Sequence, residues 1–417
     1  MKRNNITMLR CVSMIEAFAT KRNLPLIPVD ATHIHLIPSP SLFFDNITSH
    51  IAKSRRRVIL SALYLGTGDK ETQLVRLLAN KLAREPFMNV SLLLDYHRGQ
   101  RPNSNLKSSA NLLELVSCYK NFELSLVKTR GETSIFDKIQ KLNEIQATYH
   151  AKFGVFDRDV LITGANLSDL YFKNRQDRYM MIRDSCSLSE YMVDLASTFS
   201  SRQNTWADLI RELNLHHLNQ YKDPTGQSDT IVVPLVQHKP SNLNLLDELL
   251  DTIARISRDV KIHMSTGYFN PGDNVTNFHS LLIPSERSNG FFKGHGLLGY
   301  IPKLYADICR SYKESHPECR VYLYDRPGWS FHAKGVWIKY PDGQYLHIIG
   351  SSNYNLRSSQ RDLELQFVIV TTNRGLITAL EQEREALWSD TSELCLRDAP
   401  TRDKMFRVIM PVVKSFL

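Results

Sequence analysis

Two short segments of the chain, 150–152 and 332–334, both read His-Ala-Lys. Residues two apart on a strand share one face, so each histidine is expected to point the same way as its lysine while the alanine faces the core. An imidazole attacks phosphorus or carries protons, and an ammonium holds phosphate oxygens. Two such pairs brought together predict a centre that cleaves or transfers a phosphodiester through a phosphohistidine.

The residues after both segments repeat in order: an apolar strand, a turn, a second apolar strand, a glycine, an asparagine and, eleven positions later, an acidic residue. The asparagines are Asn166 and Asn353, and the acidic residues are Asp177 and Glu364. Chance rarely repeats so many features in one order, so the chain is predicted to contain a duplicated unit. With both copies in one chain, no dimer is needed to assemble the site.

The second copy reads as a β-hairpin. The Asp-Gly pair at 342–343 is a favoured two-residue turn, and pairing outward from it sets His332 opposite Asn353 and Lys334 opposite Ser351. The carboxamide is therefore predicted to share a face with the imidazole and the ammonium. Amides and cations on that face would bind the non-bridging oxygens of a phosphate.

The first copy is predicted to form the matching hairpin, with a three-residue turn at 157–159 that sets His150 opposite Asn166. Asp157 is an odd number of positions after His150, so it faces away and is assigned to the turn. Two such faces meeting would place two histidines, two lysines and two asparagines around one pocket. One histidine attacks phosphorus there, and the other handles the protons of the leaving and incoming groups.

Asp177 and Glu364 are the candidates for fixing the histidine tautomers, by accepting a ring N–H as the carboxylate of a hydrolase triad does. The alternative is that they form surface ion pairs with Arg175, Arg178 or Arg361. No metal and no other cofactor is expected, because the lysines already supply positive charge to the phosphate.

Apolar runs at 57–64 and 90–95 read as strands, and the stretch 70–84 between them reads as a helix. These lengths form a βαβ unit, which predicts a parallel or mixed sheet with helices on its faces. The polar segment 219–230 separates two half-chains of similar length and is the expected linker. The second half repeats the order, with a helix at 245–258, a strand at 260–265, a helix near 303–314 and a strand at 320–324.

The net charge of +9 suits partners that carry phosphate, whether nucleic acid, nucleotide or anionic lipid. No stretch reaches the roughly 18 uninterrupted apolar residues of a membrane span, so membrane contact is expected to be peripheral. The six cysteines are scattered without a CxxC pair, which argues against a zinc site or disulfide framework. The first 29 residues hold five basic residues and one acid, and read as a mitochondrial presequence or as a short helix of the folded domain.

His150, Lys152 and Asp157 resemble the HxKxxxxD motif of the phospholipase D superfamily. The copy at 332–334 departs from this motif, because Lys339 stands where the aspartate is expected. On a strand that position faces away from the histidine, so the departure is expected to leave the chemistry intact.

Within that superfamily, four segments resemble the eukaryotic, mitochondrial phosphatidylglycerophosphate synthases: GANLSDLYFKNRQDRY (164–179), GYFNP (267–271), NGFFKGHGLLGYIP (289–302) and RPGWSFHAKGVW (326–337). The resemblance covers nearly the whole chain from about Leu36. It implies transfer of the phosphatidyl group from CDP-diacylglycerol to glycerol 3-phosphate, with release of CMP. It also implies a peripheral position on the mitochondrial inner membrane, against an anionic lipid surface and without nucleic acid.

The fold implied by the resemblance is a pair of phospholipase D-like α/β/α sandwich domains with mixed sheets. A pseudo-twofold axis relates the domains, and the active site lies at their interface. The expected domains are 31–218 and 231–417, joined by the linker 219–230 and preceded by an N-terminal segment at 1–30.

The resemblance also implies roles for single residues. His150 is the expected nucleophile, and His332 is the expected general acid and base. Substrate contacts are assigned to Ser351, Arg357, Phe291, Phe292 and Tyr268. The glycine-rich stretch 290–300 is expected to line the acyl-chain entrance or the mouth of the site, or to be an ordinary loop. The last residues, 405–417, are expected to pack as a strand or helix, or to form a membrane foot.

Several other functions compete with this one. Within the superfamily they are phosphatidylserine synthase, cardiolipin synthase, phospholipase and nuclease. A nuclease usually shows a basic stripe with stacking aromatics, and no such run occurs beyond 53–57. A further alternative is an inactive scaffold that binds anionic lipid, against which both His-x-Lys pairs and both asparagines are intact.

Overall fold

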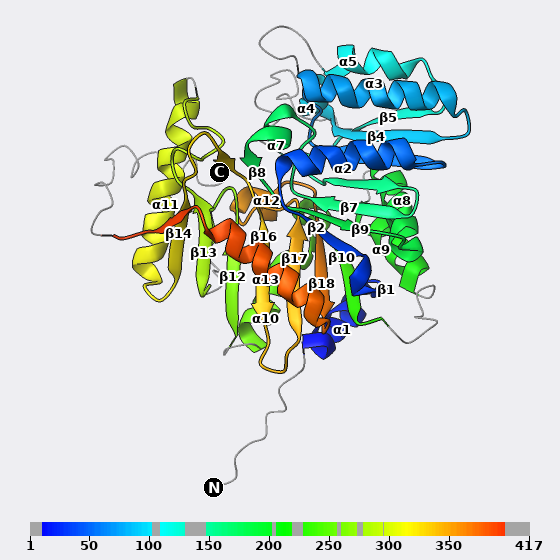
Figure 1. The fold of residues 1–417 in the computed structure, drawn as a ribbon. Coiled ribbons are helices and arrows are strands. Elements are labelled where there is room, and N and C mark those ends of the chain that lie inside the picture. Colours follow the sequence, from blue (N-terminus) through cyan, green and yellow to red (C-terminus); the bar gives the residue numbers. More distant parts are fainter. Residues whose placement is uncertain are drawn as a thin grey trace.

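The computed structural model describes residues 11–101, 109–129, 147–201, 206–218, 228–256, 260–272, 278–294 and 296–396. The chain forms two large mixed sheets with helices on their faces, one built mainly from each half of the sequence (Figure 1). The expected segment 405–417 and the expected linker up to residue 227 lie outside the described residues.

The first sheet has seven strands in the order β2-β9-β7-β6-β3-β4-β5. The expected βαβ unit is confirmed, because β3 and β4 pair in parallel and the helix α3 connects them. Apolar side chains of α2, α3 and α5 cover one face of the sheet, and those of α8 and α9 cover the other. The strands are β2 (Ile34–Ile37), β3 (Arg57–Ala62), β4 (Asn89–Asp95), β5 (Phe122–Val127), β6 (Phe153–Phe156), β7 (Asp159–Thr163) and β9 (Tyr179–Ile182). The helices are α2 (Pro40–Lys53), α3 (Asp69–Arg84), α4 (Tyr96–Gln100), α5 (Ser109–Ser117), α7 (Asp169–Lys173), α8 (Cys186–Ser200) and α9 (Trp206–Leu218).

The second sheet has ten strands, in the order β1-β10-β18-β17-β16-β12-β13-β14-β19 with β11 beside β10. Apolar residues of α10 and α11 pack on one face and those of α13 on the other. The strands are β1 (Ile27–Val29), β10 (Thr230–His238), β11 (Leu243–Asn244), β12 (Lys261–Ser265), β13 (Ser280–Pro284), β14 (Arg320–Tyr324), β16 (Gly335–Lys339), β17 (Tyr345–Gly350), β18 (Glu364–Thr371) and β19 (Thr391–Glu393). The helices are α10 (Leu245–Ile256), α11 (Ile301–Ser315), α12 (Leu356–Gln360) and α13 (Arg374–Trp388), with short 3-10 turns η1 (Ala31–His33), η3 (Lys239–Ser241) and η4 (Gly296–Tyr300).

The first described residues pack with the second half of the chain. The helix α1 (Cys11–Arg22) buries Cys11, Met14 and Ile15 in the same apolar cluster as α10, and β1 pairs antiparallel with β10. In Figure 1, α1 and β1 (dark blue) accordingly lie beside β10 rather than beside the other blue elements. Residues 11–29 therefore contribute to the core of the second sheet.

Both β-hairpins form, but their predicted turns and registers are wrong. In the first, Phe156 pairs with Asp159, so the turn has two residues and Phe153 lies opposite Ile162. The two-residue turn is possible because Asp157 adopts a left-handed conformation with φ of 54°. Each observed register is one residue away from the prediction, so the expected pairing of His150 with Asn166 does not occur.

In the second hairpin the turn is longer than predicted, whereas in the first it is shorter. Lys339 pairs with Tyr345, and Gly343 takes the left-handed conformation, with φ of 87°, in a longer connection than predicted. The expected pairings of His332 with Asn353 and of Lys334 with Ser351 are therefore wrong by one residue as well. The strands β6 and β16 begin only after the two His-Ala-Lys segments, which precede the hairpins rather than lie within them.

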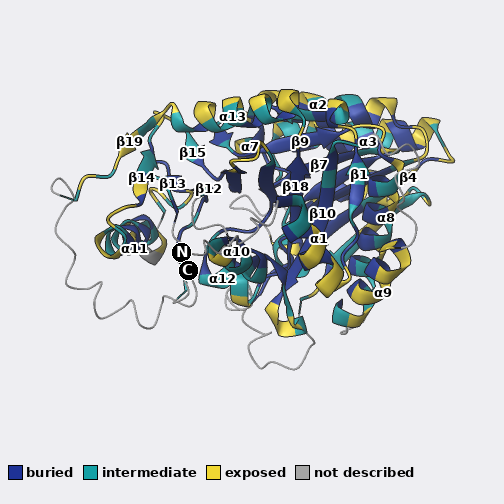
Figure 2. Ribbon diagram, turned by 90° about the horizontal axis from the view of Figure 1, so that it is seen from below, coloured by how far each residue is buried: buried dark blue, intermediate teal, exposed yellow. Residues whose placement is uncertain are grey.

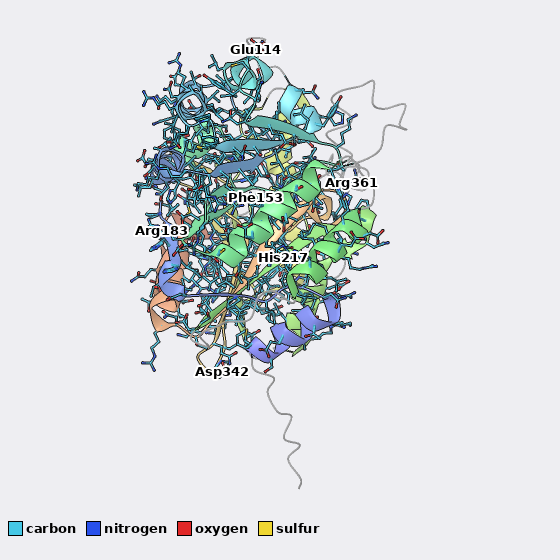
Figure 3. The ribbon with its side chains drawn as sticks, turned by 90° about the vertical axis from the view of Figure 1, so that its right-hand side faces the viewer. Glu114, Phe153, Arg183, His217, Asp342 and Arg361 are labelled. Atoms are coloured by element: carbon cyan, nitrogen blue, oxygen red, sulfur yellow. The ribbon has the colours of Figure 1, made fainter. Side chains whose placement is uncertain are left out.

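The turn residue Asp157 connects the β6–β7 turn to the segment that begins β3, in the middle of the first sheet. Its carboxylate accepts the backbone N–H groups of Arg55, Arg56 and Arg57 at 2.8–2.9 Å. Partial burial would raise the pKa of this carboxyl, but the three N–H donors outweigh it and hold the pKa below its ordinary value. Figure 3 shows Phe153 near the middle of the molecule, with Asp342 at one end of it.

One apolar cluster connects the two halves. It contains residues of β6 and β7 together with residues of β16, β17 and β18, including Phe153, Ile162, Trp337 and Ile349. Figure 2 shows β7 and β18 as buried, between helices whose outer faces are exposed. Among the described residues, no helix is both long and apolar enough to cross a membrane.

Candidate active site

The two His-Ala-Lys segments leave their own sheets and bind the opposite half of the chain. The backbone N–H of His150 donates to the carbonyl of Leu363, and that of His332 donates to the carbonyl of Gln176, both at 2.8 Å. The short strand β15 (Ser330–Phe331) also pairs with β8 (Arg175–Gln176). Each histidine is thus held by the half that does not contain it, which brings the two segments to one place.

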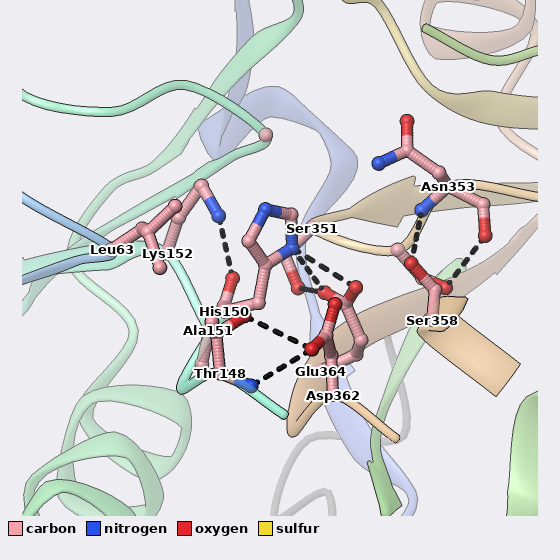
Figure 4. A network of polar contacts seen from close by, with 12 residues as sticks. Leu63, Thr148, His150, Ala151, Lys152, Ser351, Asn353, Ser358, Asp362 and Glu364 are labelled. Atoms are coloured by element: carbon pink, nitrogen blue, oxygen red, sulfur yellow. Dashed lines mark hydrogen bonds and ion pairs between the residues drawn. The ribbon is translucent and has the colours of Figure 1, made fainter. Parts of the chain in front are cut away.

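The imidazole of His150 is oriented by a carboxylate from the second half. Its Nδ1 lies 2.8 and 2.9 Å from the two carboxylate oxygens of Glu364, as Figure 4 shows. Nε2 has no protein hydrogen-bond partner among the described residues. Burial lowers the pKa of His150 below its ordinary value, although the charge of Glu364 opposes the shift. The geometry therefore favours a neutral ring that donates Nδ1–H and keeps a lone pair on Nε2.

The imidazole of His332 has more neighbours. Its Nδ1 lies 2.7 Å from Oδ2 of Asp177. Nζ of Lys334 lies 2.5 Å from Nδ1 and 3.0 Å from Nε2 of the same ring. The hydroxyl of Tyr171 is 3.3 Å from Nδ1 and 3.4 Å from Nε2. Burial lowers the pKa of His332 well below its ordinary value, and the charges of Lys334 and Arg175 lower it further. The two histidines are therefore not equivalent, and only His150 has an Nε2 without a protein partner in the described part of the chain.

The carboxylates lie deep in the protein, so the alternative of surface ion pairs is wrong. Asp177 is 2% exposed and Glu364 is fully buried. The carboxylate that Arg178 binds is that of Glu383, not that of Asp177 or Glu364. The hydroxyl of Ser351 donates to Glu364 at 2.5 Å and is itself fully buried, so it lies behind the carboxylate instead of facing a substrate.

The lysines of both segments are buried cations. Burial lowers the pKa of Lys152 to about 7, with the charge of Glu364 opposing and that of Lys334 adding to the shift. Burial likewise lowers the pKa of Lys334 to about 8, against the charge of Asp177. Nζ of Lys152 donates to the backbone carbonyl of His150 at 2.7 Å. Two buried ammonium groups beside two histidines provide a site for an anion.

The asparagines lie beside the histidines and make contacts of their own. Oδ1 of Asn166 accepts the backbone N–H of Leu63 at 3.1 Å, and its amide donates to the Tyr171 hydroxyl at 3.3 Å. Asn353 is 7% exposed and borders the same glycine as His332, because a Cβ on Gly267 would lie 3.1 Å from the His332 ring and 3.4 Å from Oδ1 of Asn353. The open pocket of about 410 Å³ that Asn353 also lines is bordered by Lys239 and Asp247 and by neither histidine. Both amides are thus positioned at the site, although not through the predicted strand pairing.

Comparison with models of known protein families gives no match. Comparison with individual proteins does. The chain is 30% identical to the mitochondrial CDP-diacylglycerol–glycerol-3-phosphate 3-phosphatidyltransferase of Gallus gallus, over 97% of this chain and 87% of that protein. The human protein of the same name is also 30% identical, with the same coverage. This chain belongs to that family.

A solved structure supports the fold of the family member. The chain resembles the phosphatidylserine synthase of Haemophilus influenzae with a TM-score of 0.75 and 20% sequence identity, over 97% of this chain and 100% of that one. Identity this low is evidence for the fold alone. The expected fold class, mixed sheets flanked by helices in two repeated halves, is confirmed.

The remaining residues assigned by resemblance lie on two sides of the histidines. The ring of Tyr268 is 5.7 Å from that of His332 and 5.6 Å from that of Phe291. Phe292 points outward and is 43% exposed. Arg357 lies on the His150 side, where its Nε donates to Asp362 at 2.9 Å. The structure thus brings Tyr268 and Phe291 to the site and gives Arg357 a carboxylate partner.

Two neighbours of His332 were not among the predicted site residues. Tyr171 contacts both the imidazole and Asn166, and the guanidinium of Arg175 lies 4.9 Å above the Tyr171 ring. Both residues belong to the segment 164–179 that carries the family resemblance. Spacing alone gave no signal for either, because they lie on α7 and β8, outside the duplicated strands.

Proposed function

We propose that the chain transfers the phosphatidyl group of CDP-diacylglycerol to glycerol 3-phosphate and releases CMP, through a phosphatidyl group carried on His150. The observation that supports this proposal is the difference between the two histidines. In His150, Nδ1 is bound to Glu364 and Nε2 has no protein partner among the described residues. The names of the relatives supply the donor and the acceptor.

In the first half-reaction, the lone pair on Nε2 of His150 attacks the phosphorus that bears diacylglycerol. A P–N bond forms as the bond to the bridging oxygen of CMP breaks, and that oxygen keeps the electron pair. CMP leaves as a phosphate and therefore needs little protonation. Lys152 and Lys334 bind the non-bridging oxygens, and their attraction grows as charge accumulates on the pentacoordinate phosphorus.

In the second half-reaction, His332 takes the proton of the glycerol hydroxyl as that oxygen attacks phosphorus. The new P–O bond forms, the P–N bond breaks and its electrons return to Nε2 of His150. The proton remains on His332 and is lost to solvent. Asp177 keeps the imidazole oriented and stabilises the charged ring.

The acceptor decides between this function and its relatives in the superfamily. Purified protein with labelled CDP-diacylglycerol should release CMP fastest with glycerol 3-phosphate, compared with serine, phosphatidylglycerol or water alone. If glycerol 3-phosphate does not stimulate release, the proposed function is wrong. A single-stranded oligonucleotide should stay intact under the same conditions, which tests the nuclease alternative.

The two lysines predict how the rate depends on pH. In the free enzyme Lys152 and Lys334 lose their protons as the pH rises through about 7 and about 8. They must be charged to bind phosphate, so kcat/KM for CDP-diacylglycerol should fall with rising pH across this range. Bound phosphate stabilises the ammonium form, so kcat should stay level to a higher pH. A kcat/KM that still rises above pH 8 would contradict this assignment.

We further propose that the enzyme docks peripherally on the anionic mitochondrial inner membrane through residues 291–294 and 298–303, called the docking loop, which includes part of η4 and the first residues of α11. Phe292, Leu298 and Tyr300 on this loop are 43%, 50% and 47% exposed. Nζ of Lys293 lies 5.6 Å above the Phe292 ring, which gives the apolar surface a cationic rim. Phe291 connects the loop to Tyr268 and so to His332.

Replacing all three exposed apolar residues of the docking loop by serine should weaken sedimentation with phosphatidylglycerol-containing vesicles by about tenfold or more. The matched control is Leu115→Ser on α5, which is 48% exposed and lies in the other half of the chain. Equal loss of vesicle binding in both variants would count against the loop. Sedimentation with vesicles that lack anionic lipid should be weak for the wild-type enzyme and for both variants.

A further inference from the structure

The duplicated halves differ at one position that faces the active site. Gln176 and Leu363 occupy equivalent places, because their carbonyls accept the N–H groups of the two histidines at the same distance, 2.8 Å. The residue before each is Arg175 in the first half and Asp362 in the second. The pseudo-symmetry therefore puts a guanidinium on the His332 side where the His150 side has a carboxylate.

Both carboxylate oxygens of Asp362 accept hydrogen bonds from other residues of the protein. Its Oδ1 accepts the backbone N–H and the hydroxyl of Thr148 at 2.8 and 3.0 Å, and its Oδ2 accepts from Arg357 at 2.9 Å. These contacts fix the segment that leads to His150. The role of Asp362 is therefore structural. Of the two equivalent positions, 175 and 362, only position 175, on the His332 side, carries a cation.

Arg175 has no such explanation. It is only 7% exposed, and its Nε is buried without a hydrogen-bond partner. Its Nη2 donates to the hydroxyl of Tyr268 at 3.1 Å, and its guanidinium carbon lies 4.9 Å above the ring of Tyr171. Within the part of the chain that the structure describes, Arg175 forms no ion pair with a carboxylate. A buried cation with no ion-paired carboxylate, and only the more distant charge of Asp177 to offset its own, is costly, which is characteristic of a binding site.

The neighbours of Arg175 are also the neighbours of His332. The rings of Tyr171 and Tyr268 lie 5.2 and 5.7 Å from the His332 ring. Gly290 closes the other side, since a Cβ there would lie 2.1 Å from Nη2 of Arg175 and 2.5 Å from the Tyr268 hydroxyl. The guanidinium is thus held in place beside the histidine that handles the acceptor.

We infer that Arg175 binds the phosphate of the acceptor, glycerol 3-phosphate, beside His332. This inference rests on the proposed function. The transferred phosphate already has Lys152 and Lys334, so a third buried cation serves a second anion. The hydroxyl that His332 deprotonates is only a short carbon chain from the acceptor's phosphate, and the planar fork of arginine matches phosphate oxygens. In the first half-reaction the same place receives the phosphate of departing CMP.

The test compares two acceptors that differ only in this phosphate. Full-length wild-type enzyme and the Arg175→Gln variant are assayed with glycerol 3-phosphate and with glycerol. The variant should lose on the order of 10- to 100-fold in kcat/KM for glycerol 3-phosphate, mainly through KM. Its kcat/KM for glycerol, which has no phosphate to bind, should fall by a much smaller factor, so the preference for the phosphorylated acceptor collapses. Arg175→Lys, which keeps the charge without the fork, should be intermediate.

Arg357→Gln is the matched control, because it removes the half-buried arginine of the other side. It should lower the rates with both acceptors alike and leave the preference intact. Exchange of labelled CMP into CDP-diacylglycerol, which needs no acceptor, reports on the donor. A variant that loses exchange but keeps the wild-type preference for glycerol 3-phosphate would assign Arg175 to the donor alone and overturn the inference. If glycerol 3-phosphate does not stimulate CMP release by the wild-type enzyme, the proposed function itself is wrong.

Discussion

The His332→Ala variant should release about one CMP per enzyme from CDP-diacylglycerol and then stop, with a phosphatidyl group left on His150. The first half-reaction needs little acid catalysis because CMP is a good leaving group. The second half-reaction needs a base for the glycerol hydroxyl, and only His332 is placed to supply it. Loss of a general base costs roughly 10²- to 10⁴-fold, so turnover should nearly cease while the intermediate accumulates.

Intact-protein mass spectrometry after denaturation at neutral pH would detect the adduct as an added phosphatidyl mass. The control is His150→Ala, which should show neither a burst of CMP nor an adduct, because it lacks the nucleophile. An adduct that forms in His150→Ala but not in His332→Ala would reverse the two roles. If both variants turn over normally, phosphohistidine chemistry is wrong for this protein.

The sequence predicted the elements whose patterns are local. The strand at 320–324 appears as β14 with the same bounds, and the helix predicted at 70–84 begins one residue earlier, at Asp69. Both could be predicted because apolar periodicity is recognised over a few neighbouring residues. The duplicated His-Ala-Lys units were equally legible, since a repeat is visible without any knowledge of the fold.

Hairpin register could not be predicted, because it depends on the conformation of single turn residues. Asp157 adopts φ of 54° and shortens the first turn, and Gly343 adopts φ of 87° in the second. Neither value follows from composition, and a change of one residue in a turn shifts every pair in the hairpin. The asparagines reach the site through the loops that follow the strands, which the pairing argument did not include.

Which histidine each carboxylate contacts could not be predicted from the sequence, for a different reason. Spacing along the chain identifies Asp177 and Glu364 as equivalent, but it does not say which histidine each one contacts. Glu364 reaches a histidine 214 positions away, across the boundary between the halves. Arg175 is similar, because only the three-dimensional environment shows that its Nε is buried without a hydrogen-bond partner.

The crossed pairing predicts opposite defects in the two carboxylate variants. Glu364→Gln should abolish exchange of CMP into CDP-diacylglycerol, because it disturbs the tautomer of His150, the nucleophile of the other half. A carboxamide in this position costs about 10⁴-fold in comparable triads. Asp177→Asn should retain the exchange and stop after one CMP, as His332→Ala does. If each acid served the histidine of its own half, the two defects would be interchanged.

Asp157→Asn is the matched control for both variants, because it changes a motif carboxylate that contacts only backbone N–H groups near Arg56. It should leave both half-reactions near the wild-type rates. Non-additivity then separates catalysis from folding: residues that act as one unit lose little more when both are replaced. Glu364→Gln should therefore add almost nothing to the defect of His150→Ala, whereas in His332→Ala it should abolish the burst that the single variant retains. A burst that survives in the double variant would show that Glu364 does not act through His150.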